Sequence, residues 1–229
     1  MKKRTIVISL GGSLIIPKEI DHAFLEKFKT TLTQHYTRYK FVVICGGGTI
    51  ARKYISILQK QGKSLEQQSF AGIRATRMNA KFMSQFFGKK ANDTLPLSMK
   101  SVKDNLRKNN VVFCGALRYA PNETSDSTSA KLANFFHTDL INITNISGLY
   151  TSNPKTNPKA KFISKISWQK FEKKALKLKY KPGQHFVLDQ HAATLIKKHK
   201  IKTYIIGPEL TNLDKLLNNK KFRGTTIKD

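Results

Sequence analysis

The chain alternates between short apolar runs and longer stretches in which apolar residues recur at helical spacing. The short runs predict strands at residues 4–10, 40–45, 93–98, 110–115, 139–144 and 201–207. Helical spacing predicts helices at residues 21–36, 49–60, 73–87, 101–109, 128–137, 168–177 and 189–199. Asp21 stands where the first helix would be capped, and residues 146–167 predict a region of turns.

This alternation predicts an α/β fold with an open, mainly parallel sheet. Strands separated by helices pair in parallel, with right-handed crossovers and helices on both faces. No long linker or internal repeat divides the 229 residues, so we expect one compact domain of one or two lobes. Ligands of such sheets bind at the carboxyl ends of the strands. The residues directly after each strand are therefore the candidates for chemistry.

Two of the loops that follow predicted strands are rich in glycine, namely GGS at 11–13 and GGGTIAR at 46–52. Glycine lets backbone N–H groups approach phosphate oxygens, and a following helix adds the positive end of its dipole. One such loop is often only a tight turn, but two in the same half of a domain favour a doubly phosphorylated ligand or two ligands. Neither loop has the spacing of a P-loop or of a dinucleotide-binding fingerprint.

Other residues that follow predicted strands allow both a functional and a purely structural interpretation. Arg52 suits bidentate contact with phosphate, although by itself it is equally a surface charge. Residues 124–129 bring Thr, Ser and Asp to the start of a helix, where such residues are favoured as caps whatever the function. A cap and a phosphate site are compatible because both use the same free N–H groups.

Six motifs occur in an order and spacing that resembles the amino-acid kinase superfamily and, within it, the archaeal-type uridylate (UMP) kinases. They are GGS (11–13), GGGTIARKY (46–54), GIRATRMNA (72–80), ITNISGLYTSNP (143–154), VLDQHAA (187–193) and GTTI (224–227). The resemblance spans essentially the whole chain. It implies a three-layer αβα sandwich of the acetylglutamate kinase-like type. It also implies an enzyme of pyrimidine nucleotide biosynthesis that transfers a phosphoryl group from ATP with Mg²⁺ to UMP, giving UDP.

The resemblance further implies how one domain, residues 1–229, divides between two nucleotides. The acceptor side would be roughly residues 1–135 and the ATP side roughly residues 136–229. Residues implied to contact ATP are Gly11, Gly12, Ser13, Gly48, Arg52, Thr144, Asn145, Tyr150 and Asn153. Residues implied to contact UMP are Gly47, Ser69, Asn122, Glu123, Thr124 and Ser125. Arg52 and Asp189 would be catalytic, with Asp189 helping to organise the phosphates and the metal.

Four features depart from the pattern of the family. Ser9 stands where many members have Lys, Ser69 where an Asp binds the ribose, and Ser147 and Asn153 where two carboxylates lie near ATP. The acceptor loop is about three residues longer and includes Arg118 and Tyr119. Mg²⁺ often needs only one or two carboxylates besides phosphates and water, so Asp189 and Asp126 are candidates to hold it.

These departures leave alternatives to an active UMP kinase. One is a diverged member that binds nucleotides with little or no turnover. Another is a kinase for a different small phosphate, such as isopentenyl phosphate. Members of that related group carry a His in the second glycine loop, and GGGTIARKY has none, which favours UMP.

The formal charge of +28, from 42 Lys and Arg against 14 Asp and Glu, raises the question of an RNA partner. A basic composition spread over a solvated surface explains the charge equally, and no RNA-binding motif accompanies it. We therefore expect no specific nucleic-acid partner, only weak non-specific RNA binding at low salt.

The cysteine content and the lengths of the apolar runs indicate the cellular compartment of the protein. Cys45 and Cys114 are too few for a disulfide framework, and each follows an apolar run as a buried hydrophobe would. The basic start followed by an apolar run is interrupted at 11–13, unlike a signal peptide, and no run is long enough to cross a bilayer. We expect a cytoplasmic protein without a membrane partner. Related uridylate kinases are hexamers, so we also expect a homo-oligomer.

Overall fold

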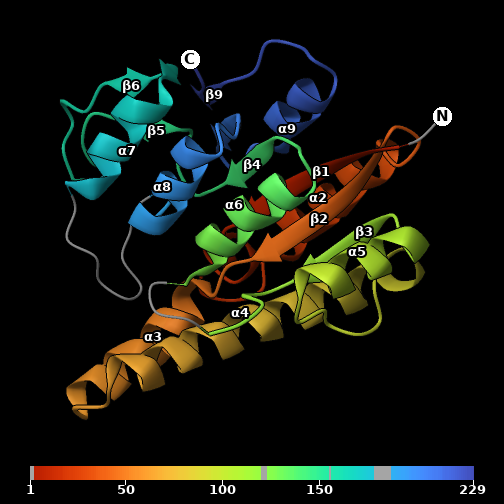
Figure 1. Cartoon of the computed structure of the whole chain (residues 1–229), viewed down its shortest axis with the longest axis horizontal. Coiled ribbons are helices and arrows are strands. Elements are labelled where there is room, and N and C mark those ends of the chain that lie inside the picture. The colour runs from red at the N-terminus through yellow and green to blue at the C-terminus, as the bar shows by residue number, and fades with distance from the viewer. Residues whose placement is uncertain (1–2, 120–122, 155, 178–186) are drawn as a thin grey trace.

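The structure, a computed structural model, describes residues 3–119, 123–154, 156–177 and 187–229. Within them, one sheet has the strand order β3-β2-β1-β4-β8-β9-β7 (Figure 1). Its strands are β1 (Arg4–Leu10), β2 (Tyr39–Cys45), β3 (Val111–Cys114), β4 (Leu140–Ile143), β7 (Lys165–Ile166), β8 (Thr203–Ile206) and β9 (Gly224–Ile227). Neighbours pair in parallel except β8 and β9, which are antiparallel. A small antiparallel hairpin, β5 (Leu149–Tyr150) with β6 (Phe162–Ile163), stands beside this sheet.

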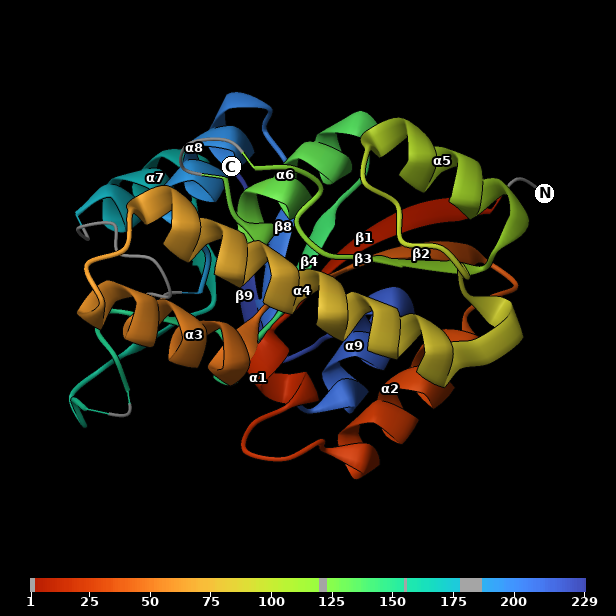
Figure 2. The same ribbon diagram turned by 90° about the horizontal axis from the view of Figure 1, so that it is seen from below.

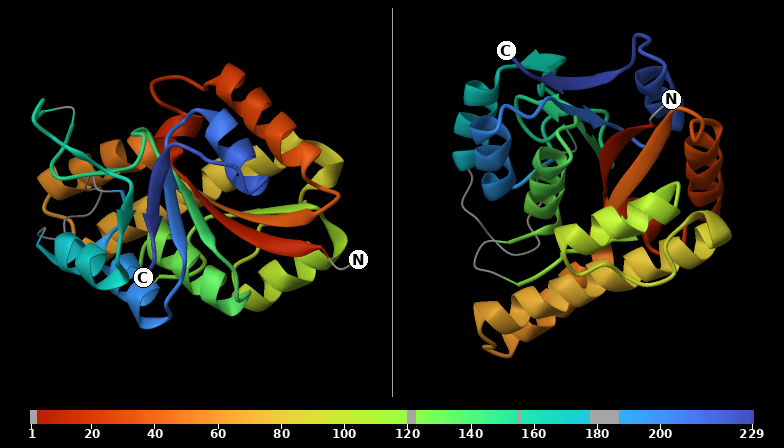
Figure 3. Two further views of the ribbon diagram at one scale, coloured as in Figure 1. Left: turned by 90° about the horizontal axis from the view of Figure 1, so that it is seen from above. Right: turned by 45° about the vertical axis from the view of Figure 1, so that its right-hand side comes forward.

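Helices cover both faces of the sheet, as Figures 2 and 3 show. Their bounds are α1 (Gly12–Ile15), α2 (His22–Gln34), α3 (Gly48–Lys60), α4 (Leu65–Phe87), α5 (Met99–Lys108), α6 (Ser125–Phe135), α7 (Trp168–Leu176), α8 (Gln190–Lys198) and α9 (Leu210–Leu217). Side chains of β1 alternate between two cores, with Ile6 and Ile8 in one and Val7 in the other. The first core contains residues of α2, α9 and the second half of α4, and the other contains residues of α5 to α8. The predicted three-layer αβα fold is confirmed.

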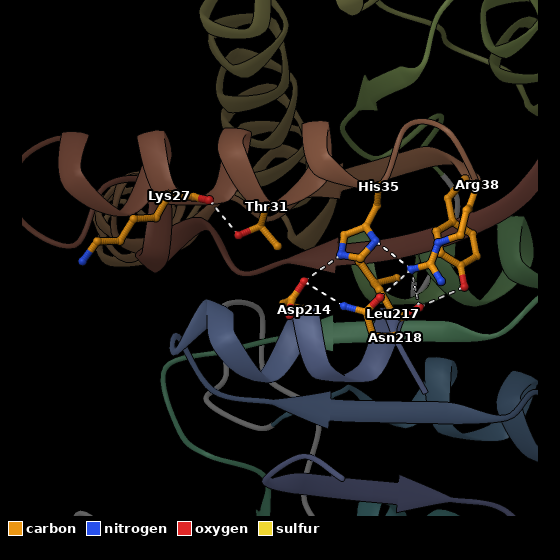
Figure 4. A network of polar contacts seen from close by, with 8 residues as sticks. Lys27, Thr31, His35, Arg38, Asp214, Leu217 and Asn218 are labelled. Carbon is orange, nitrogen blue, oxygen red and sulfur yellow. Dashed lines mark hydrogen bonds and ion pairs between the residues drawn. The ribbon is translucent and has the colours of Figure 1, made fainter. Parts of the chain in front are cut away.

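A polar network fastens α9 to the end of α2 (Figure 4). The His35 ring nitrogens lie 2.9 Å from Asp214 Oδ1 and 3.0 Å from Arg38 Nη2. Arg38 also donates to the Leu217 carbonyl and, over 2.8 Å, to Asn218 Oδ1. Because Arg38 Nη2 is a donor, it fixes the His35 proton on Nε2, facing Asp214. The network satisfies polar groups at the edge of the first core and so holds α9 on α2.

The predicted strand at residues 93–98 is wrong, since this segment is irregular. The Asn92 side chain accepts from the Phe113 backbone N–H at 2.7 Å and donates to the Phe113 carbonyl at 3.0 Å. These bonds occupy backbone groups of β3 that a neighbouring strand would use. Pro96 also lacks the N–H that a ladder requires.

Several boundaries also differ from the predictions. Helix α4 begins eight residues before the predicted residue 73, because Ser64 and Gln67 form a capping box at its start. Helix α6 begins at Ser125 rather than residue 128, and Thr124 with Ser127 forms the corresponding box. Helix α9 and strand β9 were not among the predicted elements. Residue 21 caps α2 as predicted, with its side chain accepting from the Phe24 N–H.

Both cysteines are buried and unpaired, as expected of small hydrophobes. Burial raises the pKa of the Cys114 thiol to about 12 and holds that of Cys45 well above its usual range. In the described part of the chain, no helix combines the length and apolarity that a membrane span would need.

Candidate active site

The two glycine loops lie side by side because β1 and β2 are adjacent and in parallel register. Leu10 pairs with Cys45 at the ends of these strands, and the Gly46 N–H donates to the Leu10 carbonyl over 2.8 Å. On the other side of β1, the Gly11 N–H donates to the Ile143 carbonyl of β4 over 2.9 Å. The carboxyl ends of three neighbouring strands thus meet at these glycines, where the fold predicts a ligand.

Two of the glycines are required by the packing of one loop on the other. A Cβ atom at Gly12 would lie 2.3 Å from the Gly46 carbonyl oxygen. A Cβ atom at Gly48 would lie 2.4 Å from the Gly12 carbonyl carbon, and Gly48 also has a φ of +59°. The bare backbones therefore allow the loops to touch, and their contact forms the floor of a cleft. The glycines serve this contact in addition to any approach to phosphate.

Three longer helices begin at this cleft. Gly47 precedes α3, Thr124 precedes α6 and Asp189 precedes α8, and all three residues line the cleft. The first turn of each helix has backbone N–H groups without a helical acceptor, and the dipole places positive potential there. The free N–H groups at the starts of α3 and α6 offer an anion donors without a basic side chain, whereas at the start of α8 the Asp189 carboxylate accepts from the Ala192 N–H.

The cleft is acidic although the chain is strongly basic. Among the described residues that line it, the lone Lys or Arg is Arg52, whereas Glu123, Asp126 and Asp189 contribute three carboxyl groups. Arg52 is partly buried and donates to Thr49 Oγ1 over 3.1 Å, which directs the guanidinium along the first turns of α3. Partial burial lowers the pKa of Arg52 from its usual range. The excess positive charge of the protein therefore lies mostly outside the cleft.

Two carboxyl groups lie close together in the cleft, that of Asp189, which is buried, and that of Asp126, which is partly buried. Asp189 accepts hydrogen bonds from the Ala192 N–H, at 2.8 Å, and from the Thr124 hydroxyl. Asp126 accepts from the Ser9 hydroxyl at 3.3 Å. Burial, and then repulsion by Asp189, raises the pKa of Asp126 to about 7, and burial also raises the pKa of Asp189. Two carboxylates this close repel each other, so the pair is stabilised by a cation or a proton between its members.

The raised pKa of Asp126 predicts a pH-dependent stability in the unliganded protein. Between about pH 4, where an exposed Asp titrates, and pH 7, the folded state retains a proton that the unfolded state has released. The free energy of unfolding should therefore fall as the pH rises through this window and change little beyond it. Urea denaturation from pH 4 to 8 should show a shallower fall in Asp126→Asn, whose amide does not titrate. Equal slopes in both proteins would contradict the assignment.

Most of the residues predicted from the sequence meet in this one cleft. Its lining includes Gly11, Gly12, Ser13, Gly47, Gly48, Arg52, Ser69, Glu123, Thr124, Ser125, Thr144, Asn145 and Asp189. Asn122 lies outside the described residues. Tyr150 and Asn153 do not line the cleft: Tyr150 packs edge-on against Phe162 in the β5–β6 hairpin, and Asn153 is exposed in the following turn. The contacts of these residues with a ligand stay predictions.

Two polar residues of the cleft were not predicted as site residues, and a third was not predicted to have a role there. Asn142 is a single amide in the apolar strand β4, and it donates to the Val187 carbonyl close to Asp189. Thr76 of α4 accepts from the Ala116 N–H at 3.0 Å and so holds the start of the acceptor loop. Ser9, noted only as a replacement for Lys, pairs in register with Asn142 and supports Asp126. For Ser9 and Asn142 the available signal was a lone polar residue inside an apolar strand, whereas Thr76 lies in helix α4 and has no such signal.

Amide donors at helix starts and a carboxyl pair that attracts a cation are what a phosphorylated ligand with a divalent ion requires. The fold and the cleft thus define an α/β protein with a site at its strand ends that is suited to phosphates. A family model described as the amino acid kinase family matches residues 4–207, and the chain belongs to this family.

Characterised relatives resemble the chain over nearly its full length. A protein of Pyrococcus abyssi named uridylate kinase is 32% identical over 97% of this chain and 98% of its own. The crystal structure of a uridylate kinase from Archaeoglobus fulgidus superposes with a TM-score of 0.81 at 31% identity, covering 97% of this chain and 99% of that one. A UMP kinase structure from Ureaplasma parvum, at 21% identity and a TM-score of 0.81, shows the shared fold.

Proposed function

We propose that the protein is an ATP-dependent UMP kinase that transfers the γ-phosphoryl group of ATP to UMP, giving UDP and ADP. The observation that carries the proposal is one cleft in which two glycine loops, three helix starts and a pair of carboxyl groups converge. The full-length likeness to proteins named uridylate kinase supports this acceptor in particular. Phosphoryl transfer needs mainly positioning and neutralisation of charge, which is what such a cleft provides.

We infer that different residues of the cleft contact ATP and UMP. We infer that Gly11, Gly12 and Ser13 hold ATP phosphates, with Thr144 and Asn145 on the adenosine side. Gly47, Ser69 and Thr124 would face UMP on the opposite side, and Gly48 would lie between the two phosphate chains. Arg52, at the start of α3, would neutralise charge on the phosphoryl group as it moves. The N–H groups at the starts of α3 and α6 would bind its oxygens.

The carboxyl pair fits Mg²⁺. Asp189 is buried and the adjacent Asp126 is partly buried, and desolvation raises the pKa of each, so a divalent cation would stabilise both as carboxylates. Among the described residues no cluster of three or more His, Cys, Asp or Glu could hold a metal alone, so phosphate oxygens and water would complete the shell. Bound there, Mg²⁺ would offset phosphate charge. Ser9 and Thr124 would keep the two carboxylates aimed at it.

A panel of acceptors tests the proposed reaction. With ATP and Mg²⁺, we expect UMP to be converted to UDP faster than any other nucleoside monophosphate, and no product when Mg²⁺ is removed with EDTA. Product formation should be followed by ion-exchange chromatography, with isopentenyl phosphate as an added acceptor. Product from isopentenyl phosphate but from no nucleotide would overturn the proposal. Thermal stabilisation by nucleotides without any UDP would instead identify a binding protein.

We further infer that the protein acts in the cytoplasm as a homo-oligomer, with at most weak, non-specific contact to RNA. Exposed apolar side chains on the paired helices α3 and α4 support self-association, among them Tyr54, Ile57 and Met78. By analogy with related uridylate kinases we expect a hexamer. Light scattering coupled to size exclusion should give a mass several times that of one chain, and a monomeric mass at micromolar concentration would contradict this.

A further inference from the structure

A second cavity lies next to the acceptor side of the cleft, between α5, α6 and α8. Its volume is about 540 Å³, within the range typical of small-molecule sites. Its walls include the apolar side chains of Leu97, Leu117 and Phe135 and the cationic side chains of Arg118 and Lys131. This combination of an apolar wall and localised positive charge has no role in the proposed reaction.

Glu123 is shared between this cavity and the cleft. Its carboxylate lines both, whereas Lys131 lines only the second cavity. The Glu123 side chain is 6% exposed and forms an ion pair with Lys131, and it also accepts from the Ser127 hydroxyl at 3.1 Å. From the side of the second cavity, Lys131 thus neutralises the Glu123 carboxylate, which would otherwise repel an acceptor phosphate in the cleft. Because the Glu123 side chain is buried, its negative charge is costly unless the Lys131 ammonium compensates it.

The cavity has more positive charge than this one ion pair uses. Burial and the nearby charge of Arg118 both lower the pKa of Lys131, so the two cations are close enough to repel. Glu123 offsets one of them. An anionic group placed between Arg118 and Lys131 would therefore gain from both.

We propose that this cavity is an effector site for a small organic anion with an apolar body, and that its occupation weakens acceptor binding through the Glu123–Lys131 ion pair. The anionic group would lie on Arg118 and Lys131, and the apolar body on Leu97, Leu117 and Phe135. Leu97 is 55% exposed and Phe135 39% exposed, so covering them removes apolar surface from water.

The coupling follows from the competition for one lysine. When the anion draws the Lys131 ammonium toward itself, the Glu123 carboxylate is left less compensated beside the acceptor phosphate. Like charges then oppose each other across the wall of the cleft, and UMP binds less tightly. Because coupling between two sites is reciprocal, UMP must weaken the anion by the same factor. This part of the inference rests on UMP as the acceptor, whereas the binding of the anion does not.

A pair of dyes tests the site. The probe is 8-anilinonaphthalene-1-sulfonate, which has an aromatic body and one negative charge, and its control is the uncharged N-phenyl-1-naphthylamine. In fluorescence titrations the sulfonate should bind at least about tenfold more tightly than the uncharged dye. Leu97→Glu, a change at an exposed position, should weaken the sulfonate at least about fivefold. Ile20→Glu, at a residue 51% exposed in the turn before α2, should leave it unchanged.

Calorimetry tests the coupling. Saturating sulfonate should raise the Kd of UMP by about fivefold or more, a size common for linked sites. In Glu123→Gln the sulfonate should still bind but should no longer change the Kd of UMP, because the amide carries no charge. Equal affinity of the two dyes, indifference to Leu97→Glu, or complete displacement of the sulfonate by UMP would overturn the proposal. Failure of UMP itself to bind would count against the proposed function, while the dye titrations would still decide the cavity.

Discussion

Replacing Asp189 by Asn should lower kcat for UDP formation by about a hundredfold or more, while the protein remains folded. Asp189 caps α8 by accepting from the Ala192 N–H and also accepts from the Thr124 hydroxyl. An Asn side chain keeps an oxygen for the cap, and Asn caps helices about as well as Asp. What the substitution removes is one negative charge from the pair formed by Asp126 and Asp189. The loss of a fixed charge at the reacting centre typically costs this much in rate.

The control for this variant is Asp21→Asn. Asp21 caps α2 in the same way, accepting from the Phe24 N–H at 3.0 Å, but it lies outside the cleft. Both variants should melt within a few degrees of the unmodified protein, and only Asp189→Asn should lose turnover at saturating ATP, UMP and Mg²⁺. Normal turnover in Asp189→Asn would remove Asp189 from the mechanism. Lost turnover together with a collapsed melting temperature would assign it a structural role only.

The parts of the fold that were predictable are those set by local pattern. Strand β1 has the bounds that the sequence gives for it, because its apolar run is buried on both faces and needs no partner to be recognised. Residues 93–98 were misread because the bonds between Asn92 and Phe113 cross 21 residues of chain, and no local pattern reports them. Helix α9 was missed although a local signal was present, because its buried apolar residues Leu210, Leu213 and Leu217 recur at helical spacing.

In the candidate site, too, the features set by local sequence were predictable and the long-range contacts were not. The glycines stand directly after strands and the cap residues directly before helices, so the sequence located both, and the structure brings them into one cleft. The partners of those residues were not predictable. Ser9 meets Asp126 across 117 residues, and Thr124 meets Asp189 across 65, because α6 packs against both β1 and α8. The burial that raises the pKa of both carboxyl groups is likewise a property of the assembled fold.

Substituting Ala for Gly48 should lower the free energy of unfolding by about 3 kcal/mol or more and reduce activity at least tenfold. Two costs add here. An alanine with a φ of +59° is strained by about 1 kcal/mol, and its Cβ would lie 2.4 Å from the Gly12 carbon and 2.7 Å from the Gly12 oxygen. These are backbone atoms, so relief requires one glycine loop to move off the other. Displacing catalytic groups by about 1 Å is enough to cost a hundredfold in rate.

Gly62→Ala separates the two costs, because Gly62 has a φ of +66° but no atom within 4 Å of the added Cβ. It should lose only about 1 kcal/mol, the strain of the left-handed backbone, and retain full activity. Urea denaturation of both variants, with UDP formation measured in parallel, gives the comparison. If Gly48→Ala is no less stable than Gly62→Ala, the loops do not depend on their mutual contact. The glycines would then serve the phosphates alone, and Gly48→Ala would weaken nucleotide binding without destabilising the fold.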